Sequence, residues 1–150
     1  MKKIHYVLGL VALLFSCTNV QKENVTQEKV VAAYLTYEND VTPELQWVTQ
    51  INYAFGLVDT TTFDRIVILN EPRFAKIAGM KKDNPDVKIL LSLGGWGADG
   101  FSEMAADETK RKSFAQDCKR IVDEYRIDGI DVDWEYPSSS EAGISSSPED

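Results

Sequence analysis

The chain has 150 residues, with 16 lysines and arginines against 24 aspartates and glutamates, a formal charge of -8 and a sequence pI near 4.7. This acidic balance argues against a nucleic-acid-binding protein, which normally shows a basic face. Hydrophobic residues make up 43% of the chain, including three Trp, six Tyr and six Phe, so there is enough apolar surface for a packed core. We therefore expect a folded protein with no nucleic-acid partner.

The first residues have the pattern of a secretory signal. Lys2 and Lys3 precede an apolar run over residues 6–15, which is followed by Ser16 and Cys17. A basic start, a short apolar stretch and a small residue before the cleavage point are typical of such signals. The run is shorter than the roughly 20 apolar residues that a membrane-spanning helix needs.

Residues 14–17, Leu-Phe-Ser-Cys, resemble the lipobox of bacterial lipoproteins, in which the cysteine becomes the lipidated first residue. We predict a signal peptide over residues 1–16, lipidation of Cys17, and a polar tether over residues 17–28. The protein would then be exported to the bacterial cell envelope and held to a membrane by its lipid anchor. Ordinary secretion after cleavage nearby is the alternative, because Phe15 is larger than the residue usual at its position.

Apolar runs of strand length alternate with helical patterns through the rest of the chain. Four of these runs predict buried strands, at residues 30–35, 48–55, 87–93 and 130–135. The first of them is continuous enough to suggest a strand buried on both faces. A short extra strand is predicted at residues 66–69, and the serine-rich tail over residues 138–150 predicts a long loop.

Two helices are predicted between the strands. Asn70-Glu71-Pro72 has the N-cap, acid and proline of a helix start, and the Asn84-Pro85 step ends that helix. A second helix is expected to begin near Asp107, with an apolar stripe that includes Phe114, Cys118 and Ile121. Its place on the stripe makes Cys118 a small core residue rather than a reactive thiol.

This alternation predicts an α/β fold with a parallel sheet and crossover helices. A doubly wound sheet would normally carry a glycine-rich turn after its first strand, and residues 35–40 contain no glycine. A (β/α)8 TIM barrel places its active residues at the C-terminal ends of its strands, where this chain has its unusual residues. We predict a TIM barrel of which about the first four βα units are present, in residues 29–150, because a complete barrel takes about 250 residues.

The most informative stretch is Asp-Gly-Ile-Asp-Val-Asp-Trp-Glu-Tyr-Pro, residues 128–137. Side chains alternate along a strand, so the stretch has an acidic face and an apolar face. The acidic face carries Asp131, Asp133 and Glu135. The apolar face, which we expect to pack on the barrel helices, carries Ile130, Val132 and Trp134. Crowded carboxylates cannot all ionise cheaply, so at least one should keep its proton near neutral pH and could protonate a leaving group.

Other interpretations of these acids are weaker. A solvated edge strand would mix in Lys and Thr, and strands are depleted in Asp. An EF-hand loop that began at Asp131 would need glycine where Tyr136 stands. A metal site of another type is a second alternative to acid–base chemistry, although the single histidine, His5, lies in the predicted signal. We predict neither a metal nor a cofactor, and a structural role for Asp128, whose side chain has the opposite parity.

Residues 128–135 resemble the DGxDxDxE signature of family 18 glycoside hydrolases, the chitinase family. Residues 92–96, Ser-Leu-Gly-Gly-Trp, resemble the SxGGW element of that family. Residues 52–55, Asn-Tyr-Ala-Phe, and Tyr34 resemble its other barrel-mouth positions. These motifs follow one another in the expected order, so the resemblance covers nearly all of the chain beyond the tether.

The resemblance implies a specific chemistry. Glu135 would be the general acid for the glycosidic oxygen and then the base for water, while the nucleophile is the 2-acetamido oxygen of the substrate itself. Asp133 would hold the acetamido N–H and stabilise the oxazolinium intermediate, and Asp131 would share a proton with Asp133. The anomeric configuration would be retained. The sugar would be bound by Tyr34, Phe55, Gly94, Gly95, Trp96 and Tyr136.

The resemblance implies a chitinase that cuts β-1,4-linked N-acetylglucosamine polymers. An endo-β-N-acetylglucosaminidase acting on glycoprotein glycans and a sugar-binding lectin are the alternatives, and the presence of Glu135 weighs against the lectin. Later strands of the family supply a tyrosine and a tryptophan at the sugar site, and neither region occurs in these 150 residues. We therefore expect this stretch alone to be poorly active.

Overall fold

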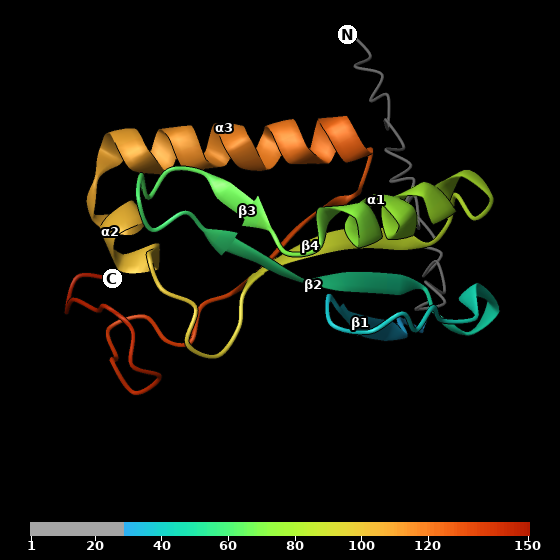
Figure 1. Cartoon of the computed structure of the whole chain (residues 1–150), viewed down its shortest axis with the longest axis horizontal. Coiled ribbons are helices and arrows are strands. Elements are labelled where there is room, and N and C mark those ends of the chain that lie inside the picture. The colour runs from blue at the N-terminus through green and yellow to red at the C-terminus, as the bar shows by residue number, and fades with distance from the viewer. Residues whose placement is uncertain (1–28) are drawn as a thin grey trace, which may run out of the picture.

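The computed structural model describes residues 29–150 (Figure 1). The predicted signal peptide, the polar tether and Cys17 lie outside the described residues, so they stay predictions. Within residues 29–150, no helix is both long and apolar enough to cross a membrane.

Four parallel strands form one sheet in their chain order, β1-β2-β4-β5. Their bounds are β1 Ala32–Thr36, β2 Gln50–Val58, β4 Lys88–Gly94 and β5 Gly129–Asp133. Each strand lies beside the one before it, as a barrel requires, whereas a doubly wound sheet reverses its order partway. The predicted extra strand is β3, Ile66–Ile68, which pairs antiparallel with the C-terminal part of β2.

The helices lie in the crossovers between these strands. They are α1 (Glu71–Gly79), α2 (Phe101–Ala106) and α3 (Glu108–Tyr125), with the 3-10 turns η1 (Leu45–Trp47) and η2 (Met80–Lys82). Figure 1 shows α1 and α3 on the same side of the sheet, as crossovers of one hand produce. The β1–β2 connection contains η1 in place of an α-helix. Helix α2 was not predicted, because six residues are too few to show a helical period.

Both predicted helix starts fall at the expected residues. Asp107 is the N-cap of α3 and its side chain accepts a hydrogen bond from the backbone N–H of Lys110. Asn70 is the N-cap residue of α1, but its side chain does not cap the helix, and its backbone is left-handed with φ 49°. Its side-chain amide donates instead to the carbonyl of Tyr37, which ties α1 to the chain after β1.

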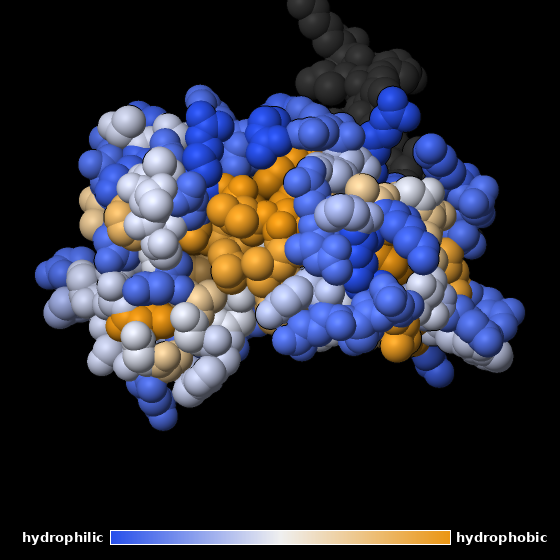
Figure 2. Space-filling view, in the orientation of Figure 1, coloured by the Kyte–Doolittle hydropathy of each residue, from blue (hydrophilic) through white to orange (hydrophobic). Residues whose placement is uncertain are grey.

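The core lies between the sheet and the helices. Ile51 of β2, Leu91 of β4 and Ile121 of α3 are fully buried in it. Figure 2 shows an apolar area in the middle of one face, over β3 and the neighbouring part of β2, where Val67 is 47% exposed. In the described residues the core therefore reaches the surface beside β3.

Two residues expected to be structural are confirmed as such. The ring of Trp134 stacks on Phe101 with centroids 5.4 Å apart and packs against the core. Cys118 also packs against the core, and its burial raises the pKa of the thiol to about 11. At that pKa the thiol stays protonated near neutral pH, so it is a poor nucleophile.

Asp128 is likewise structural, as predicted. It precedes β5 at the opposite end from the other acids, and its carboxylate accepts a 2.8 Å hydrogen bond from the backbone N–H of Ile89. Lys81 and Lys88 pair with the same carboxylate at 2.6 and 3.3 Å. This carboxylate thereby joins the start of β4 to the start of β5.

Two predictions about burial are wrong. Strand β1 is not buried on both faces: Tyr34 is 57% exposed and only Leu35 is buried, because β1 pairs with β2 alone among the described strands. Val132 is 61% exposed, although its neighbour Ile130 packs against the core. Strand β5 also pairs with one described strand only, and it ends at Asp133, so Glu135 follows the strand instead of lying within it.

Candidate active site

The side chain of Asp131 on β5 is hydrogen-bonded to side chains of the other three parallel strands. Its Oδ2 accepts a hydrogen bond from each of the other three strands. The donors are the Tyr34 hydroxyl at 2.9 Å, the Asn52 amide at 3.0 Å and the Ser92 hydroxyl at 2.7 Å. Three donors on one oxygen fix the position of this carboxyl group relative to all four strands.

The hydrogen bond to Asp131 has an electrostatic consequence for Tyr34. It raises the pKa of the Tyr34 phenol above its ordinary value, because the proton is held by the carboxylate. Tyr34 was predicted to bind sugar, and the structure places its hydroxyl on Asp131. A tyrosine kept neutral in this way acts as a donor and fixes the position of that acid.

Asp133 and Glu135 continue the acidic series toward the C-terminal end of β5. Burial raises the pKa of Asp133, and the negative charges of Glu135 and Asp131 raise it further. Glu135 and Asp131 are therefore both close enough to Asp133 to affect it. The raised pKa of Asp133 agrees with the expectation that crowded carboxyls resist full ionisation.

The raised pKa of Asp133 predicts a stability effect of definite sign. A carboxyl whose pKa is raised by folding favours the folded state at low pH, and that contribution is lost as the pH rises through the raised pKa. We expect Asp133→Asn to increase the free energy of unfolding at pH 7 by about 0.5 kcal/mol, because asparagine carries neither the cost of burying a carboxylate nor its repulsion by Glu135 and Asp131. Urea denaturation at pH 7 and at pH 4 would measure it, and the gain should shrink at pH 4.

Asp83→Asn is the matched control for this prediction, because Asp83 is exposed and lies away from the acidic series. The same loss of charge there should leave the difference between the two pH values as in the wild type. A Asp133→Asn variant that is less stable than the wild type at pH 7 would contradict the assignment of charge repulsion at this site.

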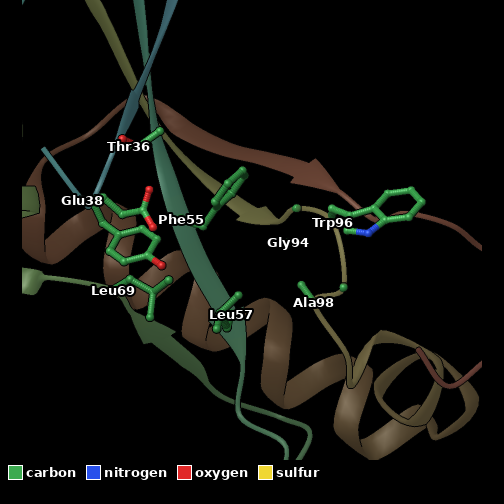
Figure 3. Close-up of a pocket in the computed structure, with 11 residues that line it drawn as sticks. Thr36, Glu38, Phe55, Leu57, Leu69, Gly94, Trp96 and Ala98 are labelled. Carbon is green, nitrogen blue, oxygen red and sulfur yellow. The ribbon is translucent and has the colours of Figure 1, made fainter. Parts of the chain in front are cut away.

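A cavity of about 410 Å³ opens at the C-terminal ends of β1, β2 and β4 (Figure 3). Four of the six predicted sugar-binding residues line it. They are Phe55, Gly94, Gly95 and Trp96. The remaining wall includes the aliphatic side chains of Leu57 and Leu69, so the cavity offers an aromatic ring and apolar surface of the kind on which sugar rings stack.

Two glycines bring the cavity wall against the acidic strand. Gly94 pairs in register with Asp133, and a Cβ at Gly94 would stand 2.0 Å from the carbonyl oxygen of Asp133. Gly95 donates its backbone N–H to that same oxygen at 2.9 Å. A Cβ at Gly95 would also stand 2.9 Å from the ring of Phe55. Only glycine permits these approaches, so the cavity and the acids are fixed relative to each other.

The other two predicted sugar-binding residues, Tyr34 and Tyr136, do not line this cavity, and neither do the three acids. Tyr136 is 43% exposed, and its ring lies edge-on to that of Trp96 with centroids 6.2 Å apart. The carboxylate of Glu135 raises the pKa of Tyr136, as a hydrogen-bond acceptor and as a nearby negative charge. Tyr136 and Trp96 thus form an exposed aromatic pair between Glu135 and the cavity.

The roles of Asn52 and Ser92 were not predicted from the sequence. Both lie inside apolar strands and are buried, at 3% and 0% exposure, yet both direct a donor to Asp131. The available signals were a polar side chain within an apolar strand and the place of both residues in the motifs at residues 52–55 and 92–96. Its partner could not be predicted, because the partner depends on the register between strands far apart in the sequence.

The family model of glycosyl hydrolases family 18 matches residues 21–149. The chain belongs to this family. It is 38% identical over 146 residues to chitinase B of Serratia marcescens, which covers 89% of this chain and 29% of the relative. It is 28% identical over 144 residues to the class V chitinase CHIT5a of Medicago truncatula, covering 88% of this chain and 38% of the relative.

Solved structures of a chitinase domain and of a family 18 N-acetylglucosaminidase share the fold. The chitinase domain of the spore coat protein CotE from Clostridium difficile superposes with a TM-score of 0.77 at 34% identity, over 87% of this chain and 37% of that one. A family 18 N-acetylglucosaminidase from Paenibacillus barengoltzii gives 0.72 at 44% identity, over 81% and 36%. The predicted α/β barrel class is thereby confirmed, and the described strands form part of the barrel. The chain spans well under half the length of each of these relatives.

Proposed function

We propose that the protein hydrolyses β-1,4 bonds between N-acetylglucosamine units, as in chitin. The observation that carries this proposal is the convergence of Tyr34, Asn52 and Ser92 on Asp131. It fixes an acidic series beside a cavity with an aromatic wall, in a chain of glycosyl hydrolases family 18. The relatives named as chitinases and as an N-acetylglucosaminidase support the same substrate class.

In the proposed reaction Glu135 acts twice. Its protonated carboxyl gives the proton to the glycosidic oxygen as the bond to the anomeric carbon breaks, and the acetamido oxygen of the substrate bonds to that carbon. The resulting carboxylate then takes a proton from the water that attacks the oxazolinium intermediate. Two inversions at one carbon leave the configuration retained. Glu135 follows the strand end and is half-buried beside Tyr136, a position that supports its proposed contact with both substrate and water.

Asp133 and Asp131 have different roles in the proposed reaction. Asp133 accepts a hydrogen bond from the acetamido N–H, which orients the amide oxygen toward the anomeric carbon and stabilises the positive charge that develops on the ring. Asp131 is held in place by three donors and shares a proton with Asp133. Burial raises the pKa of Asp133, and the charges of Glu135 and Asp131 raise it further. Different surroundings thereby give two chemically identical groups different tasks.

The test compares two substrates that differ at one position of the sugar. The natural full-length protein should hydrolyse N-acetylchitotetraose and release a product whose first-formed anomer is β, as proton NMR during the first minutes would show. Cellotetraose, which has a hydroxyl where the acetamido group stands, should not be cleaved, because it lacks the internal nucleophile. Equal cleavage of both substrates, or a first-formed α anomer, would refute the mechanism.

A further inference from the structure

Glu38 is the one ionisable carboxyl among the residues that line the 410 Å³ cavity. It follows β1, which is the outer strand of the described sheet on the side opposite to β5 and its acids. Figure 3 shows its carboxylate directed into the cavity, facing Phe55 of β2. Within residues 29–150, no lysine or arginine pairs with it.

The segment that carries Glu38 is held firmly in place. Arg73 is 6% exposed, and its guanidinium donates to the carbonyl of Thr36 at 3.1 Å and to that of Val41 at 2.8 Å, one on each side of Glu38. The backbone N–H of Tyr37 donates to a carbonyl of β2 at 2.7 Å. A side chain on such a fixed segment loses little backbone freedom when it binds a ligand.

We propose that Glu38 is a specificity-determining residue that accepts hydrogen bonds from hydroxyls of a second sugar unit. This inference rests on the proposed function, in which the unit that reacts lies at Asp133 and Glu135. A carboxylate can only accept, and sugar hydroxyls are donors, so the bonds are of the stronger, charge-assisted kind. The apolar face of the same unit would lie on Phe55 and Leu57 of the cavity wall.

The direction of the substrate follows from the strand order. The reacting unit lies at the end of β5, next to Gly94 at the end of β4, and Glu38 lies beyond the end of β1. A sugar chain laid across the strand ends would bring its next unit over β2 and toward Glu38. Substrates with only the reacting unit would not reach this carboxylate, so Glu38 should make binding depend on chain length.

The experiment measures binding in the natural full-length protein with the substitution Glu135→Gln, so that substrates are not consumed. Isothermal titration calorimetry would give the Kd values for N-acetylglucosamine, which has only the reacting unit, and for N-acetylchitobiose and N-acetylchitotriose. Adding Glu38→Gln keeps the shape of the side chain and removes its charge. The ratio of the Kd of the shortest sugar to that of the longest should then fall by about tenfold, which is the contribution of a hydrogen bond to a charged group. Asp40→Asn is the matched control, since Asp40 lies exposed on the same segment and outside the cavity.

The outcomes separate the two proposals. If the sugars bind and the gain with length is the same in Glu38→Gln as in Asp40→Asn, the role of Glu38 is overturned while the proposed function stands. If none of the sugars binds to the Glu135→Gln protein, the proposed function fails and the role of Glu38 fails with it. A tenfold loss in Glu38→Gln alone supports both.

Discussion

Replacing Glu135 by glutamine should lower kcat/KM for N-acetylchitotetraose by about 10²- to 10⁴-fold, the usual contribution of a general acid–base residue. Glutamine has nearly the same shape but cannot give a proton to the glycosidic oxygen or take one from water. Glu135 lies just beyond the end of β5 and is half-buried, so we expect the fold to tolerate the change. Steady-state kinetics beside a thermal unfolding curve would separate the loss of chemistry from a loss of structure.

Glu108→Gln is the control for this substitution. Glu108 is on the surface of α3, where its side chain is 71% exposed and pairs with Lys112. Surface pairs of this kind contribute roughly 0–1 kcal/mol, so the same chemical change there should leave kcat/KM within about twofold of the wild type. Activity that survives in Glu135→Gln would remove the assignment of the acid, whatever the fold.

Gly94→Ala should lower the free energy of unfolding by about 3 kcal/mol or more, at the upper end of the effects of single substitutions, because the backbone would be strained. The added Cβ would stand 2.0 Å from the backbone oxygen of Asp133, and Gly94 has φ +121°, which L side chains rarely adopt. The contact is with backbone, so no side-chain rotation relieves it. Strands β4 and β5 would have to separate where Gly94 pairs with Asp133.

Gly79→Ala is the matched control, because a Cβ at Gly79 would meet nothing within 4 Å and its φ is helical. Alanine there should stabilise the protein by about 0.4–1 kcal/mol, since it restricts the unfolded chain. Urea denaturation of the two variants in parallel would measure both values. A Gly94→Ala protein as stable as the wild type would mean that β4 and β5 are not joined as described.

The stretch over residues 128–137 shows where sequence analysis succeeds. Strand alternation grouped Asp131 with Asp133 on one face and set Asp128 apart with a structural role, whereas Glu135 follows the end of β5. The structure shows Asp128 bound to Lys81 and Lys88, and the charges of Glu135 and Asp131 raising the pKa of Asp133. Alternation failed for Val132, which is exposed, because burial depends on what lies over a strand and not on the strand itself.

Residues that can bind or react but stand in no local sequence pattern could not be assigned a role from the sequence. Arg73 looks like an exposed charge on an amphipathic helix, yet it is buried and holds the segment after β1. Glu38 stands in a polar connection and has no motif around it. Its place at the cavity depends on how that connection packs with β1, β2, β4 and the segments after β3 and β4, which also line the cavity.

Spacing between near neighbours was enough to predict the alternation of strands and helices, the start of α3 at Asp107 and the order of the acids. The sharing of one Asp131 oxygen by Tyr34, Asn52 and Ser92, and the contact of Gly94 with the backbone of Asp133, arise only in the folded chain. Those contacts join strands that are tens of residues apart. Their registers are set by packing of the whole sheet against its helices, which no local pattern encodes.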